Sequence, residues 1–155
     1  MSLKLRTRDF AALSAHLCAA YPEEGCGVLM GRERDGARVV ERVSGLPNQR
    51  EDSRGNRYLI APESILAADR EARTAGLDIL GFFHSHPDHP ARPSAFDLEH
   101  AWACYSYVIA SIERGTLAEM NSFRLSEDRS SLEPEPIELV DEARESTPQI
   151  EEPAS

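Results

Sequence analysis

Two histidines, a serine and an aspartate stand at a spacing that could build a metal site. His84 and His86 end an apolar run, and side chains two residues apart on a strand point to the same side of a sheet. Ser94 follows in the chain and Asp97 comes three residues later, so the proline-rich loop before them can fold back and bring a carboxylate to the imidazoles. Two imidazoles and one carboxylate leave the fourth tetrahedral position of a zinc ion to water, whose pKa zinc lowers to about 7. This pattern predicts a hydrolytic site.

Each half of the pattern also has a simpler interpretation. A His-x-His pair at a strand end is commonly ordinary polar surface. Ser94-x-x-Asp97 fits a helix capping box, with serine at the cap and an acid three positions later. Three other residues could supply the third metal ligand: Asp88, His89 and His100. Spacing alone leaves the choice among these ligands open.

Three helices are expected to hold or flank the site. Apolar residues recur at helical spacing from Thr7 to Tyr21. A second helix is expected from Pro62, at a first helical position, to Gly76, a suitable C-cap. A short third helix over Ser94 to Trp102 would carry Asp97 near its start.

Strands are expected to fill much of the remaining chain. Asp35-Gly36 is a strong hairpin signal, and the polar residues 48–56 lack periodicity and indicate a loop. The expected strands are Glu24 to Met30, Val39 to Val43, Tyr58 to Ile60, Leu77 to His84, Tyr105 to Ser111, Met120 to Leu125 and Ile137 to Val140. This mixture of helices and strands predicts an α/β layer fold.

The composition is that of an ordinary globular chain. Its 155 residues are 41% hydrophobic and 28% charged, which favours one domain, placed at residues 1–141. Residues 142–155 are acidic and poor in apolar side chains, so a disordered tail is expected. The net charge of −10 disfavours nucleic acid as a partner. No signal peptide or membrane span is recognisable, so we expect a cytoplasmic protein without membrane contact. The sequence does not indicate its oligomeric state.

The three cysteines indicate reduced thiols rather than a disulfide framework. They are widely spaced and form no CxxC pair. Cys18 and Cys104 are expected to be small buried hydrophobic residues. Cys26 would share a strand face with Glu24 and could line the site, although burial is the favoured interpretation.

The metal pattern forms part of a longer resemblance to a known family. The string His84–Pro87, a gap, and then Ser94–Asp97 resembles the metal signature of the JAMM (MPN+) metallopeptidases. The segment Tyr21–Gly31 resembles the region in which these enzymes carry a catalytic glutamate, and alignment on its glycine selects Glu24. By composition alone, Glu24 and its neighbour Glu23 would be solvated surface charges.

The resemblance implies both a fold and a mechanism. The fold would be the α+β, cytidine-deaminase-like layered fold of the JAMM/MPN domain, with a mixed central sheet flanked by helices. Zn²⁺ would be bound by His84, His86 and Asp97. Glu24 would act as general base and then general acid, and Ser94 would donate a hydrogen bond to the oxygen that becomes negative.

The resemblance also implies a substrate. Residues 77–111 are similar to a small prokaryotic branch that cleaves peptide or isopeptide bonds at the C-terminus of ubiquitin-like or sulfur-carrier proteins. The substrate would be an extended tail ending in Gly-Gly and joined by an amide to an amine. Ala61 stands before Pro62 where the family often has aspartate, which predicts a weaker cap on that helix.

Two alternatives of other classes remain at this point. The same fold serves in non-catalytic MPN scaffolds, but these lack the metal ligands that are all present here. A RadC-like DNA-associated protein carries a similar His-x-His-Pro and Ser-x-x-Asp pattern, and the acidic net charge disfavours that alternative.

Overall fold

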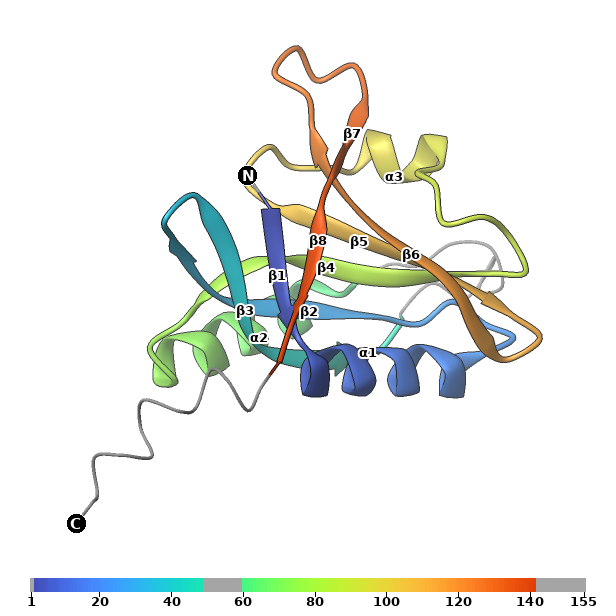
Figure 1. Ribbon diagram of the computed structural model, residues 1–155, viewed down its shortest axis with the longest axis horizontal. Helices are drawn as coiled ribbons and strands as arrows, with labels where there is room; N and C mark the ends of the chain where they lie inside the picture. Colours follow the sequence, from blue (N-terminus) through green and yellow to red (C-terminus); the bar gives the residue numbers. More distant parts are fainter. Residues whose placement is uncertain (1, 49–59, 142–155) are drawn as a thin grey trace.

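The computed structural model describes residues 2–48 and 60–141, which form one eight-stranded sheet with three helices (Figure 1). The helices are α1 (Thr7–Ala20), α2 (Pro62–Thr74) and α3 (Ala95–Glu99). The strands are β1 (Ser2–Arg6), β2 (Cys26–Arg34), β3 (Ala37–Leu46), β4 (Asp78–Pro87), β5 (Ser106–Glu113), β6 (Thr116–Leu125), β7 (Leu132–Glu135) and β8 (Ile137–Val140). The described helices and strands therefore confirm a mixed sheet flanked by helices.

The sheet is strongly curved. Its strand order is β7-β6-β5-β4-β2-β3-β1-β8, with β1–β3, β1–β8 and β4–β5 parallel and the other pairs antiparallel. Only Pro136 separates β7 from β8, although these two strands lie at opposite edges of the sheet. The curvature brings the two edges together, and β7 and β8 run across the sheet as one continuous segment in Figure 1.

The two faces of the sheet carry separate cores, because strand side chains alternate. Leu29, Phe83 and Val108 lie in one core with residues of α1, and their strand neighbours Val28, Phe82 and Tyr107 lie in the other with residues of α2. His84 follows Phe82 at a spacing of two, so its side chain belongs to the α2 side of the sheet. This alternation fixes the face on which the candidate metal ligands lie.

Most sequence-based boundaries are confirmed within a few residues. The hairpin turn at Asp35 and Gly36 has φ values of 50° and 78°, and Gly76, just beyond α2, has φ of 75°. Ala61 caps α2 without a side-chain hydrogen bond, which agrees with the weaker cap predicted there. Among the described residues, no helix has the length and apolar character needed to cross a bilayer.

Several expectations were wrong or concern residues outside the described ranges. Strands β1 and β7 were not predicted, and α3 is shorter than expected because the N–H of Trp102 donates to the Tyr107 hydroxyl at 2.7 Å rather than continuing the helix. Ile60 does not lie in a strand, so the predicted strand at Tyr58 to Ile60 was wrong at this residue. Three predictions concern residues outside the described ranges: the rest of that strand at 58 and 59, most of the loop at 48–56, and the tail at 142–155. Cys104 is exposed and Cys18 half-buried, so the expected burial of Cys104 was wrong.

Candidate metal centre

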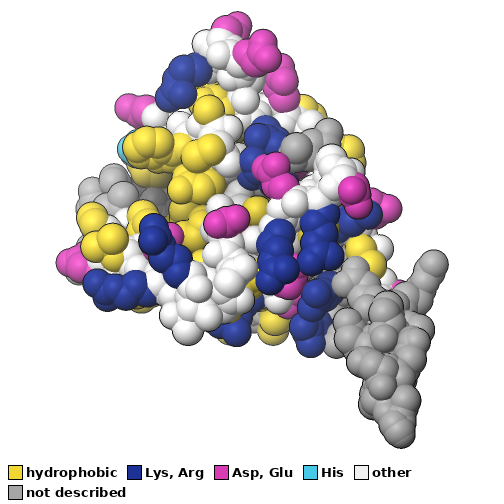
Figure 2. All heavy atoms as spheres, turned by 90° about the vertical axis from the view of Figure 1, so that its left-hand side faces the viewer, with side chains coloured by type: hydrophobic (Ala, Val, Ile, Leu, Met, Phe, Trp, Pro, Cys, Tyr) yellow, Lys and Arg dark blue, Asp and Glu magenta, His cyan; other side chains and the backbone are white. Residues whose placement is uncertain are grey.

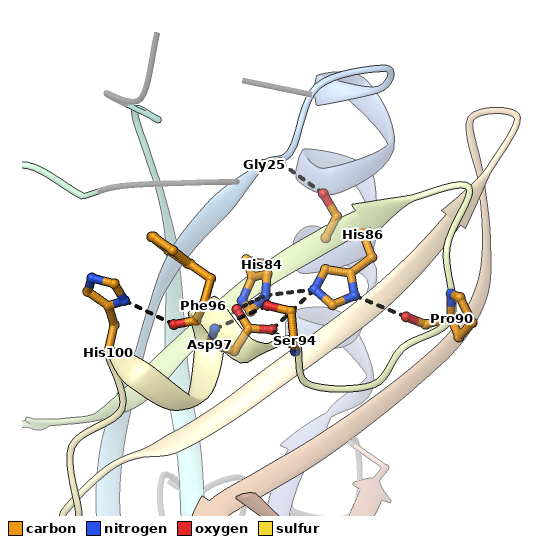
Figure 3. Close-up of polar contacts among 9 residues, drawn as sticks. Gly25, His84, His86, Pro90, Ser94, Phe96, Asp97 and His100 are labelled. Carbon is orange, nitrogen blue, oxygen red and sulfur yellow. Dashed lines mark hydrogen bonds and ion pairs between the residues drawn. The ribbon is translucent and has the colours of Figure 1, made fainter. Parts of the chain in front are cut away.

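Three side chains from β4 and α3 converge on one point (Figure 3). His84 Nε2 lies 3.1 Å from Asp97 Oδ1, and His86 Nε2 lies 3.3 Å from Asp97 Oδ2. The two Nε2 atoms are 3.2 Å apart. Ligand bonds of about 2.0–2.1 Å around tetrahedral zinc place neighbouring donor atoms roughly 3.3–3.4 Å apart. The two Nε2 atoms and a carboxylate oxygen of Asp97 lie within 4.8 Å of one another, which is close enough for the three side chains to hold a single metal ion such as zinc.

The two imidazoles have different surroundings, and one of them favours the neutral form that binds a metal. His86 Nδ1 lies 3.0 Å from the carbonyl oxygen of Pro90, which accepts a hydrogen bond from it and leaves Nε2 on the side of the cluster. Burial lowers the pKa of His86, but its contacts with Asp97 and Pro90 outweigh burial and raise it. His84 is 1% exposed, and burial lowers its pKa despite the opposing effect of Asp97, so its imidazole is neutral at pH 7. A neutral imidazole is the ligand form of histidine.

A capping box aims the Asp97 carboxylate at the histidines. Ser94 Oγ accepts a hydrogen bond from the Asp97 N–H at 3.1 Å, and the Ser94 N–H donates to Asp97 Oδ2 at 2.8 Å. Burial would raise the pKa of Asp97, but its contacts with His84 and His86 hold it well below its usual value. The capping-box interpretation and the metal-ligand interpretation of Ser94-x-x-Asp97 are therefore compatible, because the cap orients the ligand.

The other candidate ligands lie elsewhere. Asp88 accepts a hydrogen bond from the Tyr21 hydroxyl at 2.6 Å and another from the Arg114 N–H at 2.9 Å. His100 Nδ1 contacts a carbonyl oxygen within α3. In residues 2–48 and 60–141, the grouping of His84, His86 and Asp97 is the one set of three or more such side chains whose ligand atoms converge. Asp88, His89 and His100 therefore do not take part in it.

Glu24 is brought beside the cluster by backbone pairing ahead of β2. The Gly25 N–H donates to Ser85 Oγ at 2.8 Å, and the Ser85 N–H donates to the Gly25 carbonyl at 3.0 Å. With Gly25 opposite Ser85, Glu24 falls opposite His86 on the same face of the sheet. Glu24 is 4% exposed, whereas Glu23 is exposed, so the expectation of a solvated charge was wrong for Glu24.

Cys26 lies on the same sheet face but is not poised for chemistry. It pairs with His84 in the register of β2 and β4 and is fully buried. Burial, together with the negative charge of Glu24, raises the pKa of the thiol to about 12. The thiol is therefore neutral at pH 7, and the interpretation of Cys26 as a buried residue is confirmed.

The contacts that support these side chains were not predicted from the sequence. Ser85 joins β4 to the segment that carries Glu24, and Pro90 orients His86 through its backbone carbonyl. Tyr21 and Asp88 join the end of α1 to the loop that follows His86. The position of Ser85 between two histidines was a usable signal, whereas a backbone carbonyl such as that of Pro90 leaves none in the sequence.

Comparison with known proteins identifies a family and several relatives, two of which are described next. A sequence profile described as prokaryotic homologs of the JAB domain matches residues 7–126. The "Probable TtuB-protein conjugate cleaving protease" of Thermus thermophilus is 41% identical over 95 residues, which cover 61% of this chain and 60% of that protein. The "Desampylase" of Haloferax volcanii is 38% identical over 114 residues, covering 72% of this chain and 80% of that protein. The chain thus spans less than two thirds of the Thermus protein.

Solved structures share the fold. A protein from Desulfitobacterium hafniense superposes with a TM-score of 0.79 at 36% identity, over 90% of this chain and 94% of that one. A JAB1/MPN domain protein from Archaeoglobus fulgidus superposes with a TM-score of 0.57 at 18% identity, over 90% of this chain and 98% of that one. The second likeness concerns the fold alone, and it agrees with the layered fold expected from the sequence.

Proposed function

This chain belongs to the prokaryotic homologs of the JAB domain, and on that basis we propose that it is a zinc-dependent hydrolase of amide bonds. The profile match and the two relatives confirm the resemblance to JAMM metallopeptidases that the motifs indicated. The observation that carries the proposal is the convergence of His84, His86 and Asp97, whose ligand atoms lie within 4.8 Å of one another. We further propose that residues 1–141 form the catalytic domain, with 142–155 as an acidic tail.

The surrounding residues suit hydrolysis by an activated water molecule. Zinc bound by His84, His86 and Asp97 would polarise the scissile carbonyl and lower the pKa of a water molecule. Glu24 takes a proton from the attacking water and returns it to the nitrogen as the carbon–nitrogen bond breaks. The hydroxyl thereby ends on the carbonyl carbon, and a free amine leaves.

In this proposal, Ser94 stabilises the charge that develops on the carbonyl oxygen. Its Oγ already accepts a hydrogen bond from the Asp97 N–H, so the hydroxyl proton remains available for donation. Ser94 is exposed, which makes that proton accessible to a substrate. A donor held in place before the reaction stabilises the transition state more than one that must reorganise.

The names of the relatives support a substrate class for this chain. One relative is named for cleaving TtuB-protein conjugates and the other for desampylation. We therefore propose that this chain hydrolyses the amide between the C-terminal Gly-Gly tail of a ubiquitin-like or sulfur-carrier protein and an amine. We place this reaction in the cytoplasm.

The test is hydrolysis of a defined conjugate. Purified protein is incubated with a Gly-Gly-tailed carrier protein joined to a lysine amine, with and without a zinc chelator. The free carrier and the free amine are expected only without chelator, and added Zn²⁺ should restore their release. Turnover that persists after complete removal of zinc would overturn the proposed mechanism, and no turnover by the zinc-loaded protein would favour the non-catalytic MPN scaffold instead.

A further inference from the structure

An acidic cleft of about 400 Å³ lies between the loop after β4 and the β5–β6 hairpin. Its walls include Asp88, His89, Pro90, Ser111, Glu113 and Glu119, and we call this set the acidic cleft. Three of these six side chains are carboxylates that carry negative charge at pH 7. Pro90 contacts His86 through its carbonyl oxygen, and the other residues of the set have no role in the hydrolysis proposed above.

A buried hydroxyl group lines the acidic cleft and lacks a partner. Ser111 is 1% exposed, and its Oγ has no hydrogen bond to any of the described residues. Buried hydroxyls are nearly always hydrogen-bonded, because an unsatisfied one costs about 1–3 kcal/mol. The Ser111 hydroxyl therefore indicates that the acidic cleft receives a polar group.

The acidic cleft adjoins the metal centre through two connections. Ser111 pairs with His86 in the register of the parallel strands β4 and β5, so their side chains share a sheet face at a strand spacing of about 4.8 Å. Pro90, which lines the acidic cleft, is the residue whose carbonyl oxygen contacts His86. A ligand in the acidic cleft would therefore lie one strand away from a metal ligand.

A different pocket lies on the other side of the metal centre. It has a volume of about 160 Å³ and is lined mainly by apolar and aromatic side chains, including Phe82, Phe96 and Trp102. Figure 3 shows Phe96 and His100 on one side of the histidine pair and Pro90 on the other. On the face drawn in Figure 2, which is the left-hand side of Figure 1, hydrophobic side chains gather in a patch with acidic and basic side chains around it. The centre is therefore flanked by an apolar pocket and an acidic one.

The acidic cleft suits a long organic cation better than a metal ion. Within residues 2–48 and 60–141, its acidic and histidine side chains do not converge closely enough to hold one ion, since His84, His86 and Asp97 form the single such grouping. The Arg114 cation offsets part of the charge, because it acts on Asp88. Glu113 and Glu119 face the acidic cleft without an ion pair to a described residue, although Glu119 also accepts a hydrogen bond from Asn121.

We propose that the acidic cleft binds a lysine or arginine side chain of the protein that bears the scissile amine. This proposal rests on the proposed function and names the specificity of the same site. A lysine-linked conjugate presents an extended Gly-Gly tail on one side of the scissile bond and an acceptor protein on the other. A basic residue next to the acceptor lysine would reach the carboxylates of Glu113 and Glu119 and the hydroxyl of Ser111, and it would hold the leaving amine near the centre.

The test compares leaving groups attached to the same tail. One substrate carries the Gly-Gly tail on an aminocoumarin, which has no acceptor residues. Two others carry it on the lysine of a peptide with arginine neighbours or with glutamate neighbours. We expect kcat/KM for the arginine peptide to exceed that for the glutamate peptide by about three- to tenfold, through KM, and the difference to shrink as salt rises.

Variants assign that preference to the acidic cleft. In the double variant Glu113→Gln and Glu119→Gln, the ratio of kcat/KM for the arginine peptide to kcat/KM for the glutamate peptide should fall to near one. In Ser111→Ala, the same ratio should fall by a smaller amount. Glu127→Gln, which changes an exposed acid in the β6–β7 turn, should keep the native ratio. A native ratio near one, or a double variant that keeps the native preference while folded by circular dichroism, would overturn the acidic-cleft proposal. Failure to cleave even the aminocoumarin substrate would instead overturn the proposed hydrolysis.

Discussion

Ser94 and Asp97 hold each other through two reciprocal hydrogen bonds, of 3.1 Å from the Asp97 N–H to Ser94 Oγ and 2.8 Å from the Ser94 N–H to Asp97 Oδ2. The same Asp97 oxygen that accepts from Ser94 lies 3.3 Å from His86 Nε2. One local motif therefore starts α3, orients the side chain of a candidate metal ligand and places a hydroxyl beside it. The short helix α3 serves mainly to position these two side chains.

Replacing Ser94 should affect catalysis more than folding. In Ser94→Ala we expect kcat to fall by about 10²–10³, because the donor to the developing oxyanion is lost. The lost cap should also cost about 1 kcal/mol of stability. Ser94→Gly separates the two effects, since glycine at an N-cap costs only a few tenths of a kcal/mol yet offers no hydroxyl. If Ser94→Gly keeps native kcat, Ser94 acts only as a cap.

Glu24→Gln should retain zinc but lose hydrolysis. Glutamine preserves the shape of this buried side chain but cannot accept and return a proton, so we expect kcat to fall by about 10²–10⁴. Metal analysis of the purified variant should still give one zinc per chain. Glu23→Gln is the matched control, because the exposed Glu23 is expected to tolerate the change. Loss of activity in Glu23→Gln with retention in Glu24→Gln would reassign the general base.

Removing a metal ligand should abolish both zinc binding and activity. In His84→Ala and Asp97→Asn, we expect zinc content to fall well below one per chain and turnover to vanish. The native protein should also melt at a lower temperature after treatment with chelator, because a metal that binds only the folded state stabilises it. His100→Ala is the control, since His100 bonds within α3 and should keep zinc. Full zinc content in Asp97→Asn would contradict the proposed ligand set.

The metal ligands could be predicted from the sequence only in part. His84 and His86 are two residues apart, and this spacing places both imidazoles on one face of any strand, so the pairing of these two side chains follows from local geometry. The choice of Asp97 over Asp88, His89 or His100 depends on how an irregular loop folds back, and that is set by long-range contacts rather than by spacing. The family resemblance supplied that choice. The structure brings Asp97 to the histidines and leaves the others away from them.

Other features had no local signal in the sequence. The burial of Glu24 arises from the pairing of Gly25 with Ser85, two segments far apart in the chain. Strand β7 (LEPE) has a proline and two acids in four residues, so its composition is typical of a loop, and only pairing with β6 makes it a strand. Pairing across the sheet therefore decides features that residue type alone cannot indicate.

Arg38 is a buried cation that joins strands distant in the chain. Its side chain is 3% exposed, and its guanidinium donates to the carbonyl oxygens of Leu80 at 2.7 Å and Cys104 at 2.9 Å. It also lies 3.4 Å from a carboxylate oxygen of Glu33. Arg38 therefore connects β3 to β4 and to the segment that precedes β5, where the curved sheet brings them together.

Replacing Arg38 should destabilise the fold without altering the chemistry. In Arg38→Ala, the buried carbonyls of Leu80 and Cys104 lose their donors, and we expect the free energy of unfolding in urea to fall by about 2–4 kcal/mol. Arg42→Ala is the control, because the exposed ion pair of Arg42 with Glu71 should contribute no more than about 1 kcal/mol. Below the melting transition, kcat of Arg38→Ala should remain close to native, since its contacts lie away from the metal ligands. A loss below 1 kcal/mol for Arg38→Ala would show that water or neighbouring side chains replace its hydrogen bonds, and that this buried cation does not hold the curved sheet together.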